Sequence, residues 1–285
     1  MTALTCFSCA RPKTPAPAPN PPGRVVSLAP NITEILYAIG AGHLLVGNTR
    51  YCKYPPEARK VPKIGGYYDP SYERIVAARP DVVILLPEHV EARQRLNDLG
   101  ISWAEVGCEG LDGLLDAVRR IGEICGRPGP ASAVAADMGR SIEEIRSRPR
   151  SGAAPRALLC VGRGMGTGSV SEVYIAGTET FHGTLLVAAG GSNVYSGRLR
   201  FPLLSQEGIL RLNPDVIFEF IPDLAEQAIS EKDIKADWRR FPGVPAVVSD
   251  RIHVFGGEHV AIPGPRCIAL LDAMQRALYP KEVPR

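Results

Sequence analysis

The chain of 285 residues is 45% hydrophobic and 22% charged, a composition typical of a globular protein that buries a core without disulfide bonds. A formal net charge of +3, without a long lysine or arginine run, argues against nucleic acid or an anionic membrane surface as a partner. No stretch reaches the roughly 18 consecutive apolar residues of a membrane-spanning helix. The seven cysteines are an odd number spread along the chain, which argues against a disulfide framework.

Residues 1–23 are predicted to be a disordered leader or tether. Cys9 is followed by the proline- and alanine-rich tract "ARPKTPAPAPNPPG", which favours an extended chain. One interpretation is that the true start lies upstream and that Cys9 is the lipid-anchored N-terminus of a lipoprotein. Ser8 suits such a cleavage site, whereas Cys6 at the third position before it does not; the alternative is a leader without a role. A redox or zinc site at Cys6 and Cys9 is disfavoured, because no further ligands follow.

Residues 24–128 are predicted to form an N-terminal α/β lobe, because strand and helix patterns alternate along them. A capping box of Asn31 and Glu34 is expected to start the first helix, and Asp69-Pro70 is expected to open the helix that carries Glu73. The strand "DVVILL" has the β-branched composition of a buried parallel strand. Strands are expected at 24–30, 44–47, 81–86 and 101–107, and further helices at 31–42, 90–100 and 111–126.

Residues 129–150 are predicted to be a linking helix, since apolar residues from Val134 to Ile145 follow helical spacing. A helix from Pro130 to Arg148 would be on the order of 30 Å long. Residues 151–285 are predicted to form a second α/β lobe. Its strands are expected at 156–162, 193–196 and 252–255, and its helices at 184–191 and 265–278.

One phrase occurs twice along the chain. "YERIVAARPDVVILL" begins at Tyr72 and "QEGILRLNPDVIFEF" begins at Gln206, with a constant offset of 134 positions between matched residues. Such a repeat predicts two similar lobes. The expected fold is therefore α/β, with two Rossmann-like lobes built on central parallel sheets, joined by a single long α-helix, and with a ligand cleft between the lobes.

Motifs of catalysis are not found. The glycine-rich loop "VGRGMGTGS" matches neither a phosphate-binding loop nor G-x-G-x-x-G, although its amides could face an anion near a ligand. No serine lies in G-x-S-x-G, and the five histidines form no metal-binding spacing. His259, in a loop after a strand, is either a metal ligand or a solvated loop histidine. We expect no catalytic residues and no cofactor.

Aromatic residues gather in predicted loops: Tyr51, Tyr54, Tyr67 and Tyr68 in the first lobe and Phe201 in the matching loop of the second. Two-lobed α/β proteins bind ligands at the carboxyl ends of their strands, where aromatic faces suit a large, flat ligand. The alternative is that the tyrosines pack under proline-rich loops.

Glu73 and Glu207 occupy equivalent positions in the repeat, each in a predicted first helical turn. An acid there is stabilising by about 0.3–1 kcal/mol through the helix dipole. Their equivalence on two lobes also indicates two exposed carboxylates that could grip a symmetric partner carrying arginines.

In combination, several phrases resemble one family: "SLAPNITEILYAIG", "YCKYPPEA", "IGGYYDPSYERIVAARPDVVI", "FPLLSQEGILRLNPDVI" and "PGPR". From Arg24 to Leu278 the chain is similar to the helical-backbone (class III) substrate-binding proteins of ABC importers, which serve vitamin B12, ferric siderophores and haem. The vitamin B12 subgroup is the most similar. The resemblance implies limited lobe motion around one rigid helix.

The resemblance also implies roles for particular residues. Glu73 and Glu207 match the glutamates that dock on permease arginines, and Tyr51, Tyr67, Phe201 and Arg266 match positions close to the ligand. Where the B12 proteins often carry tryptophan, this chain has Tyr67, Leu86 and Phe201. Arg198, Arg200 and Lys53 would also suit an anionic siderophore.

We therefore predict an extracytoplasmic solute-binding protein, monomeric and not an enzyme, that delivers a cobalamin-like corrinoid to an ABC permease dimer with its ATPase subunits. The alternatives are a ferric siderophore or haem as ligand, a metallocofactor enzyme that would need Cys52 and Cys160 in the cleft, or a sensor that docks on no permease. Cys108 and Cys125 lie close enough in sequence to pair. The predicted ligand-binding residues are Tyr51, Tyr67, Tyr68, Arg198, Phe201, His259 and Arg266.

Overall fold

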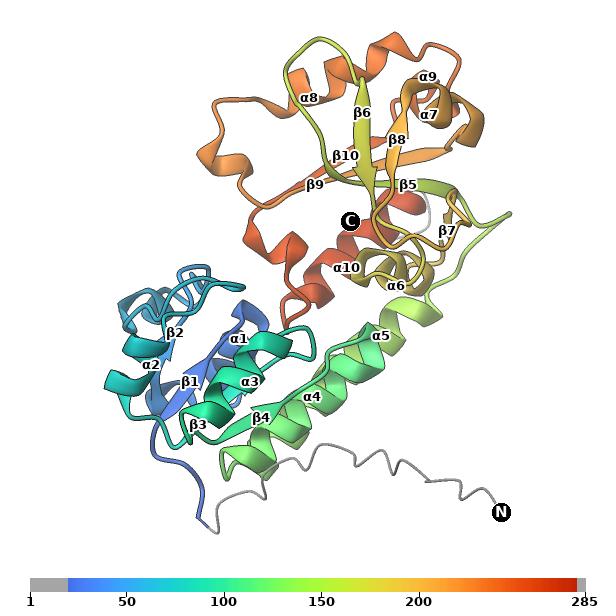
Figure 1. The fold of residues 1–285 in the computed structure, drawn as a ribbon. Coiled ribbons are helices and arrows are strands. Elements are labelled where there is room, and N and C mark those ends of the chain that lie inside the picture. Colours follow the sequence, from blue (N-terminus) through green and yellow to red (C-terminus); the bar gives the residue numbers. More distant parts are fainter. Residues whose placement is uncertain (1–19, 281–285) are drawn as a thin grey trace, which may run out of the picture.

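The computed structural model describes residues 20–280, which form two α/β lobes, each around its own sheet (Figure 1). The sheet of the first lobe has the order β2-β1-β3-β4, and all of its pairs are parallel. Its strands are β1 (Val25–Ser27), β2 (Leu45–Asn48), β3 (Val82–Leu85) and β4 (Trp103–Glu105). Its helices are α1 (Pro30–Ala38), α2 (Tyr72–Ala78), α3 (Val90–Asp98) and α4 (Gly110–Ile124).

The sheet of the second lobe has the order β10-β9-β5-β6-β8, with β7 also paired to β5. Its strands are β5 (Arg156–Gly162), β6 (Glu172–Ile175), β7 (Ser192–Asn193), β8 (Leu203–Ser205), β9 (Val216–Ile221) and β10 (Ile252–Gly256). The central strands β5, β9 and β10 are parallel, whereas β6 and β8 add an antiparallel edge that the sequence analysis did not anticipate. The helices are α6 (Phe181–Ala188), α7 (Gln206–Leu212), α8 (Glu231–Asp237), α9 (Pro245–Val248) and α10 (Cys267–Leu278).

One long helix, α5 (Pro128–Ser147), runs from the first lobe to the second (Figure 1). Its 20 residues give a length of about 30 Å. Its buried residues recur every three or four positions and so form one apolar stripe: Ala131, Ala135, Met138, Ile142 and Ile145. The predicted fold class is confirmed, while the domain boundaries at 24–128, 129–150 and 151–285 stay a prediction.

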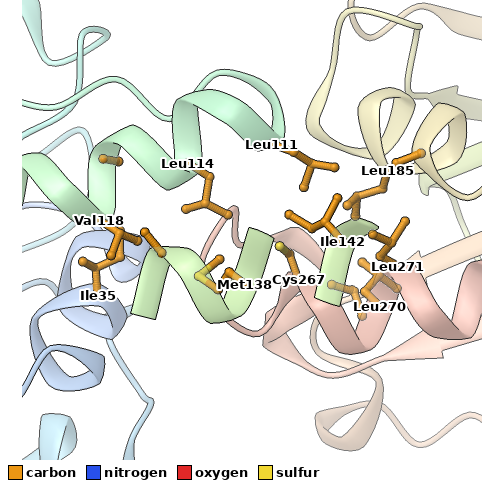
Figure 2. Close-up of a cluster of buried hydrophobic side chains, with 14 of the residues drawn as sticks. Ile35, Leu111, Leu114, Val118, Met138, Ile142, Leu185, Cys267, Leu270 and Leu271 are labelled. Atoms are coloured by element: carbon orange, nitrogen blue, oxygen red, sulfur yellow. The ribbon is translucent and has the colours of Figure 1, made fainter. Parts of the chain in front are cut away.

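A single hydrophobic core continues from one lobe into the other. It joins Ile35 and Leu114 of the first lobe, through Ile142 on α5, to Leu185 and Leu271 of the second (Figure 2). All five side chains are at most 3% exposed. Separating the lobes would expose this apolar surface, at about 25 cal/mol for each Å2, so the core resists a wide hinge motion.

The repeat in the sequence is also a repeat in the structure. Ser71 and Ser205, 134 positions apart, cap α2 and α7, and each hydroxyl accepts a hydrogen bond from the amide three residues on. Arg79 and Asn213, again 134 apart, end these helices in the left-handed conformation, with φ of 44° and 46°. The same local sequence therefore produces the same capped, two-turn helix in each lobe.

Each lobe also has an arginine at the start of its first strand that bonds the end of the repeated helix. The guanidinium of Arg24 donates to the carbonyls of Ala78 and Arg79 at the end of α2, and that of Arg156 donates to Leu212 and Asn213 at the end of α7. These contacts satisfy helix-terminal carbonyls that would otherwise lack partners.

Two predicted helix starts are wrong. α1 begins at Pro30 after Ala29, which makes no side-chain cap, and Asn31 and Glu34 are both buried. The capping box is absent because both side chains are used in tertiary contacts. α2 begins after Ser71 rather than at Asp69, whose carboxylate pairs with Arg50 at 2.9 Å.

Candidate functional site

The carboxyl ends of the first lobe's parallel strands bring together side chains from distant parts of the sequence. Asn31, after β1, donates from its Nδ2 to the Sγ of Cys108, after β4, at 3.2 Å. Tyr67, in the loop after β2, donates from its hydroxyl to the carboxylate of Glu88, after β3, at 2.6 Å. This edge is where the doubly wound fold places ligands.

Tyr67 lies in a small aromatic group. The ring of Tyr68 meets it edge-on at 4.7 Å, and the imidazole of His89 lies 4.6 Å away. Tyr68 is 77% exposed, whereas Tyr67 is half-buried. Burial, and then the Glu88 carboxylate, raise the pKa of the Tyr67 phenol, so it stays a hydrogen-bond donor.

His89 is 4% exposed and was not among the predicted site residues. Its Nδ1 accepts a hydrogen bond from the backbone amide of Leu86 at 3.0 Å, which places the proton on Nε2. That Nε2 atom makes no hydrogen bond with any residue of the described chain. Burial lowers the pKa of His89, so the imidazole is neutral.

The other predicted aromatic residues are exposed on the two lobes. Tyr51 is 48% exposed, with the guanidinium of Arg50 5.3 Å from its ring centre. Phe201 is 53% exposed and stands 134 positions after Tyr67, so the repeat relates the two. Arg198 is exposed in the same segment of the second lobe as Phe201.

Arg266 joins the second lobe to the first. Its guanidinium pairs with the buried Glu34 of α1, with Nε 3.1 Å from Oε2, and also approaches Glu258 at 3.4 Å. It lies 4.0 Å from the ring centre of Tyr54. Burial raises the pKa of Glu34, and the pairing with Arg266 opposes that rise. Arg266 was predicted to contact the ligand, whereas its pairing with Glu34 was not predicted from the sequence.

A second contact between the lobes lies at the surface. The ammonium of Lys53 is 2.6 Å from the carboxylate of Glu226, and the two side chains are 40% and 67% exposed. Such an exposed pair contributes about 0–1 kcal/mol. Lys53 was predicted to suit an anionic siderophore. In the structure its ammonium group is instead paired with the Glu226 carboxylate.

His259 and Arg266 border a groove of about 780 Å3 between α5 and α10. The predicted aromatic residues do not line it, so the structure does not bring all predicted ligand residues into one cavity. The candidate ligand site is the aromatic, strand-end region rather than this groove, because none of the predicted aromatic side chains lines the groove. The groove is also lined by Ser141, Glu144, Ile145, Arg148, Pro265, Ile268, Ala269, Asp272 and Arg276.

The glycine-rich loop after β5 is organised by the protein's own carboxylate. The amides of Gly166 and Gly168 donate to Asp237 at 2.9 and 2.8 Å. Arg163 donates to Asp237 and to Glu219, each at 2.7 Å, and all three side chains are at most 3% exposed. The amides of this loop were expected to be able to face a bound anion. For Gly166 and Gly168 this is wrong, because both amides already donate to the Asp237 carboxylate.

Glu73 and Glu207 are both exposed in the first turns of α2 and α7. Neither forms an ion pair with another residue of the described chain. The helices lie in different lobes, and both lie away from α5 (Figure 1).

The five cysteines within residues 20–280 are all free. Cys108 and Cys125 are both free, so the pairing that their spacing allowed does not occur. Burial raises the pKa of Cys108 to about 12 and of Cys125 to about 11. Cys52 lies in the first lobe and Cys160 in the second lobe's sheet. Within residues 20–280 there is no group of three His, Cys, Asp or Glu side chains placed to hold a metal ion.

Two further expectations concern the membrane. Cys9, the predicted lipid anchor, lies outside the described residues. None of the helices in residues 20–280 combines the length and apolar character needed to span a bilayer.

The two sheets with parallel central strands, the linking helix and the strand-end aromatic side chains define a two-lobed α/β binding protein. Residues 25–256 match the family described as periplasmic binding protein, and the chain belongs to that family. It is thus a periplasmic binding protein of the ABC importer class.

Similar proteins support this class. An uncharacterized ABC transporter substrate-binding lipoprotein of Bacillus subtilis, YvrC, is 25% identical over 91% of this chain and 81% of its own length. A vitamin B12-binding protein of Vibrio cholerae is 26% identical over 90% of this chain and 88% of its own. Both relatives are named as binding proteins of transport rather than as enzymes, in line with the expectation that the chain is not an enzyme.

Solved structures share the fold. The periplasmic vitamin B12-binding protein BtuF of Vibrio cholerae has a TM-score of 0.77 at 22% identity, over 90% of this chain and 97% of that one. The periplasmic haem-binding protein RhuT of Roseiflexus sp. has a TM-score of 0.74 at 26% identity, over 90% and 98%.

Proposed function

We propose that the protein binds a cobalamin-like corrinoid between its lobes and delivers it to an ABC permease dimer. The observation that carries this proposal is the pair of aromatic side chains, Tyr67 and Phe201, related by the repeat, one in each lobe. Tyr68 lies beside Tyr67, and Tyr51 is exposed on the same lobe. Aromatic faces bind a large, flat and partly apolar ring. Similarity to proteins named for vitamin B12 binding agrees with this ligand class.

A second candidate ligand is a ferric siderophore or haem. Arg198 and Arg200 are exposed beside Phe201 and could pair with ligand carboxylates. His259 and Arg266 lie between β10 and α10, where Arg266 reaches Glu34 of the first lobe, and both are proposed as further ligand contacts. A haem-binding protein among the structural relatives keeps this candidate open.

Calorimetry separates the candidates. Titration with cyanocobalamin, haemin and a panel of ferric siderophores is expected to show tight binding of cyanocobalamin. Tight binding of haemin or a siderophore instead would select the second candidate, and no binding to any of them would refute the importer-ligand proposal.

Substitution of the aromatic residues tests where that ligand lies. Tyr67→Ala and Phe201→Ala should each weaken binding by about 1–3 kcal/mol, the value of a buried aromatic contact. Tyr174→Ala is the matched control, because Tyr174 is also about half exposed but lies within strand β6, between β5 and β8. Unchanged affinity in the first two variants would make Tyr67 and Phe201 packing residues.

We further propose that Glu73 and Glu207 dock on permease arginines, that Cys9 carries a lipid anchor and that the protein acts as a monomer. The lipoprotein name of one relative supports the anchor. The double variant Glu73→Ala/Glu207→Ala should abolish transport and leave ligand affinity intact. A loss of ligand affinity would place these acids in the cleft instead. For the anchor, intact mass of the natively expressed protein should show acylation at Cys9.

A further inference from the structure

The repeated helices α2 and α7 expose apolar side chains as well as acids. Val76 is 47% exposed and Leu210 is 51% exposed, and the two are 134 positions apart. Among the exposed large apolar side chains of residues 20–280, they are the single pair related by that offset. A scattered exposed valine or leucine is ordinary, but equivalent placement in both lobes is not explained by chance exposure.

Each apolar residue lies beside the acid of its own helix. Val76 follows Glu73 by three positions and Leu210 follows Glu207 by three, so each pair shares one helix face. Ile75 and Ile209, also 134 apart, are fully buried and fix the opposite face of each helix against its lobe. The buried isoleucine thus orients the acid and its apolar neighbour outward in both lobes.

We infer that Val76 and Leu210 complete two equivalent docking patches, each an acid with an apolar contact one turn on. The partner is a two-fold symmetric membrane permease that presents, on each subunit, a basic side chain next to an apolar pocket. This inference rests on the proposed docking through Glu73 and Glu207, and it adds the apolar half of the surface.

Charge selects this partner over a second copy of the chain. Glu73 and Glu207 are exposed and lack ion-pair partners within the described chain, so a basic partner satisfies both. Two copies meeting through these patches would bring carboxylates together, which is unfavourable. The acids provide steering and register, while the apolar residues lengthen the lifetime of the complex.

Site-specific cross-linking tests the inference in the native host. A photoreactive p-benzoylphenylalanine is placed at position 73, 76 or 210, and at position 99, 187 or 248 as a control. Leu99, Val187 and Val248 are exposed to a similar or greater degree, and none has an exposed apolar equivalent in the other lobe. Positions 76 and 210 are expected to give adducts that mass spectrometry assigns to a multi-span permease subunit, and the control positions none.

The outcomes separate this inference from the docking proposal. Adducts from position 73 without adducts from 76 and 210 would refute the apolar patches and leave glutamate docking standing. No permease adducts from any of the three would overturn both. Adducts of the chain with itself from positions 76 and 210 would replace the permease by a second copy.

Affinity for the purified permease complex in nanodiscs provides a second readout. Val76→Ser with Leu210→Ser should weaken binding about tenfold or more at every salt concentration, because apolar contacts are not screened. Glu73→Gln with Glu207→Gln should instead remove most of the salt dependence. Leu99→Ser with Val248→Ser is the matched control. Full affinity of the Val76→Ser/Leu210→Ser variant would overturn the inference.

Discussion

At the scale of single residues, the ion pair of Glu34 and Arg266 is the contact between the lobes whose loss should change stability most. The Glu34 side chain is 3% exposed and that of Arg266 is 23% exposed. A buried pair of this kind adds little net stability, but removal of one partner leaves a charge without water or counter-ion. The pair therefore makes the connection between the lobes sensitive to changes at either residue.

Arg266→Met is expected to lower the free energy of unfolding by about 2–4 kcal/mol at pH 7, a value below that of a fully buried pair because Arg266 is partly exposed. Burial already raises the pKa of Glu34, and loss of the guanidinium raises it further. Above the unfolded glutamate pKa of about 4.3, the folded state then holds a proton that the unfolded state releases, so stability falls as the pH rises. Urea unfolding should show a smaller loss at pH 5 than at pH 7.

The double variant Glu34→Gln/Arg266→Met is the control, because it removes the unpaired charge. It should recover most of the lost stability and the pH dependence should disappear. An equal loss at both pH values in the single variant would show that Arg266 acts through packing on Tyr54 rather than through charge.

The sequence could not reveal this pair. Glu34 stands three residues after Asn31, and local spacing favoured a capping box, whereas its actual partner is 232 positions away. His89 was missed for a related reason, since only the fold places it under Tyr67. The exposed positions of Glu73 and Glu207 in first helical turns could be predicted, because the sequence pattern around each is local and occurs twice.

At the scale of elements, the loop after β5 depends on α8 for its shape. Gly166 and Gly168 adopt positive φ of 68° and 74°, which glycine allows at little cost. Their amides donate to the carboxylate of Asp237, the last residue of α8, and the guanidinium of Arg163 also donates to that carboxylate. The loop's conformation is therefore set by a helix that follows it by some seventy positions.

Asp237→Ala should destabilise the protein by about 3–5 kcal/mol, since it leaves the buried Arg163 with one carboxylate fewer and two amides without an acceptor. Hydrogen exchange at the amides of Gly166 and Gly168 should accelerate, measured by mass spectrometry. Asp233→Ala on the same helix is the control. Asp233 is the exposed third residue of α8 and part of its capping box, and its loss should lower stability less than Asp237→Ala does, without faster exchange in the loop. Equal protection in Asp237→Ala would mean that Asp237 does not hold the loop.

Elements with a clear local pattern of apolar residues were predicted well from the sequence. The buried strand at β3 and the apolar stripe of α5 follow from spacing that the local chain itself contains. The strands β6 and β8 were not predicted, because each is short and exposes alternate residues beside polar loops. Pairing of β6 with β5, and of β8 with β6, decides their conformation, and that pairing is not a local property.

At the scale of the whole molecule, the repeat predicted two lobes but not how firmly they are joined. The local phrases around Glu73 and Glu207 indicate duplicate units, whereas the shared core is assembled from α1, α4, α5, α6 and α10 (Figure 2). A repeat in the sequence predicts two lobes that each bury their own hydrophobic core. The structure has one core that crosses between the lobes, together with smaller clusters on the outer side of each sheet.

A shared core has a consequence for unfolding, and the two tryptophans can report it. Trp103 lies on β4 in the first lobe and Trp238 is buried in the second. In Trp238→Phe the fluorescence reports the first lobe, and in Trp103→Phe it reports the second. Neither tryptophan belongs to the shared core cluster, although Trp238→Phe removes a buried indole and lowers stability itself. Within each variant, fluorescence and far-ultraviolet circular dichroism should therefore show coincident urea transitions.

Ile142→Ala, on α5 in the middle of that core, sharpens the test. Truncation of a fully buried isoleucine costs about 2–5 kcal/mol. Because Ile142 contacts both lobes through one core, the substitution should shift the fluorescence transition of both single-tryptophan variants by a similar amount. Val173→Ala, in the cluster confined to the second lobe, should do the same if unfolding is cooperative across the molecule. A shift confined to the Trp238 signal would show that the lobes unfold separately and that the core between them does not couple their stability.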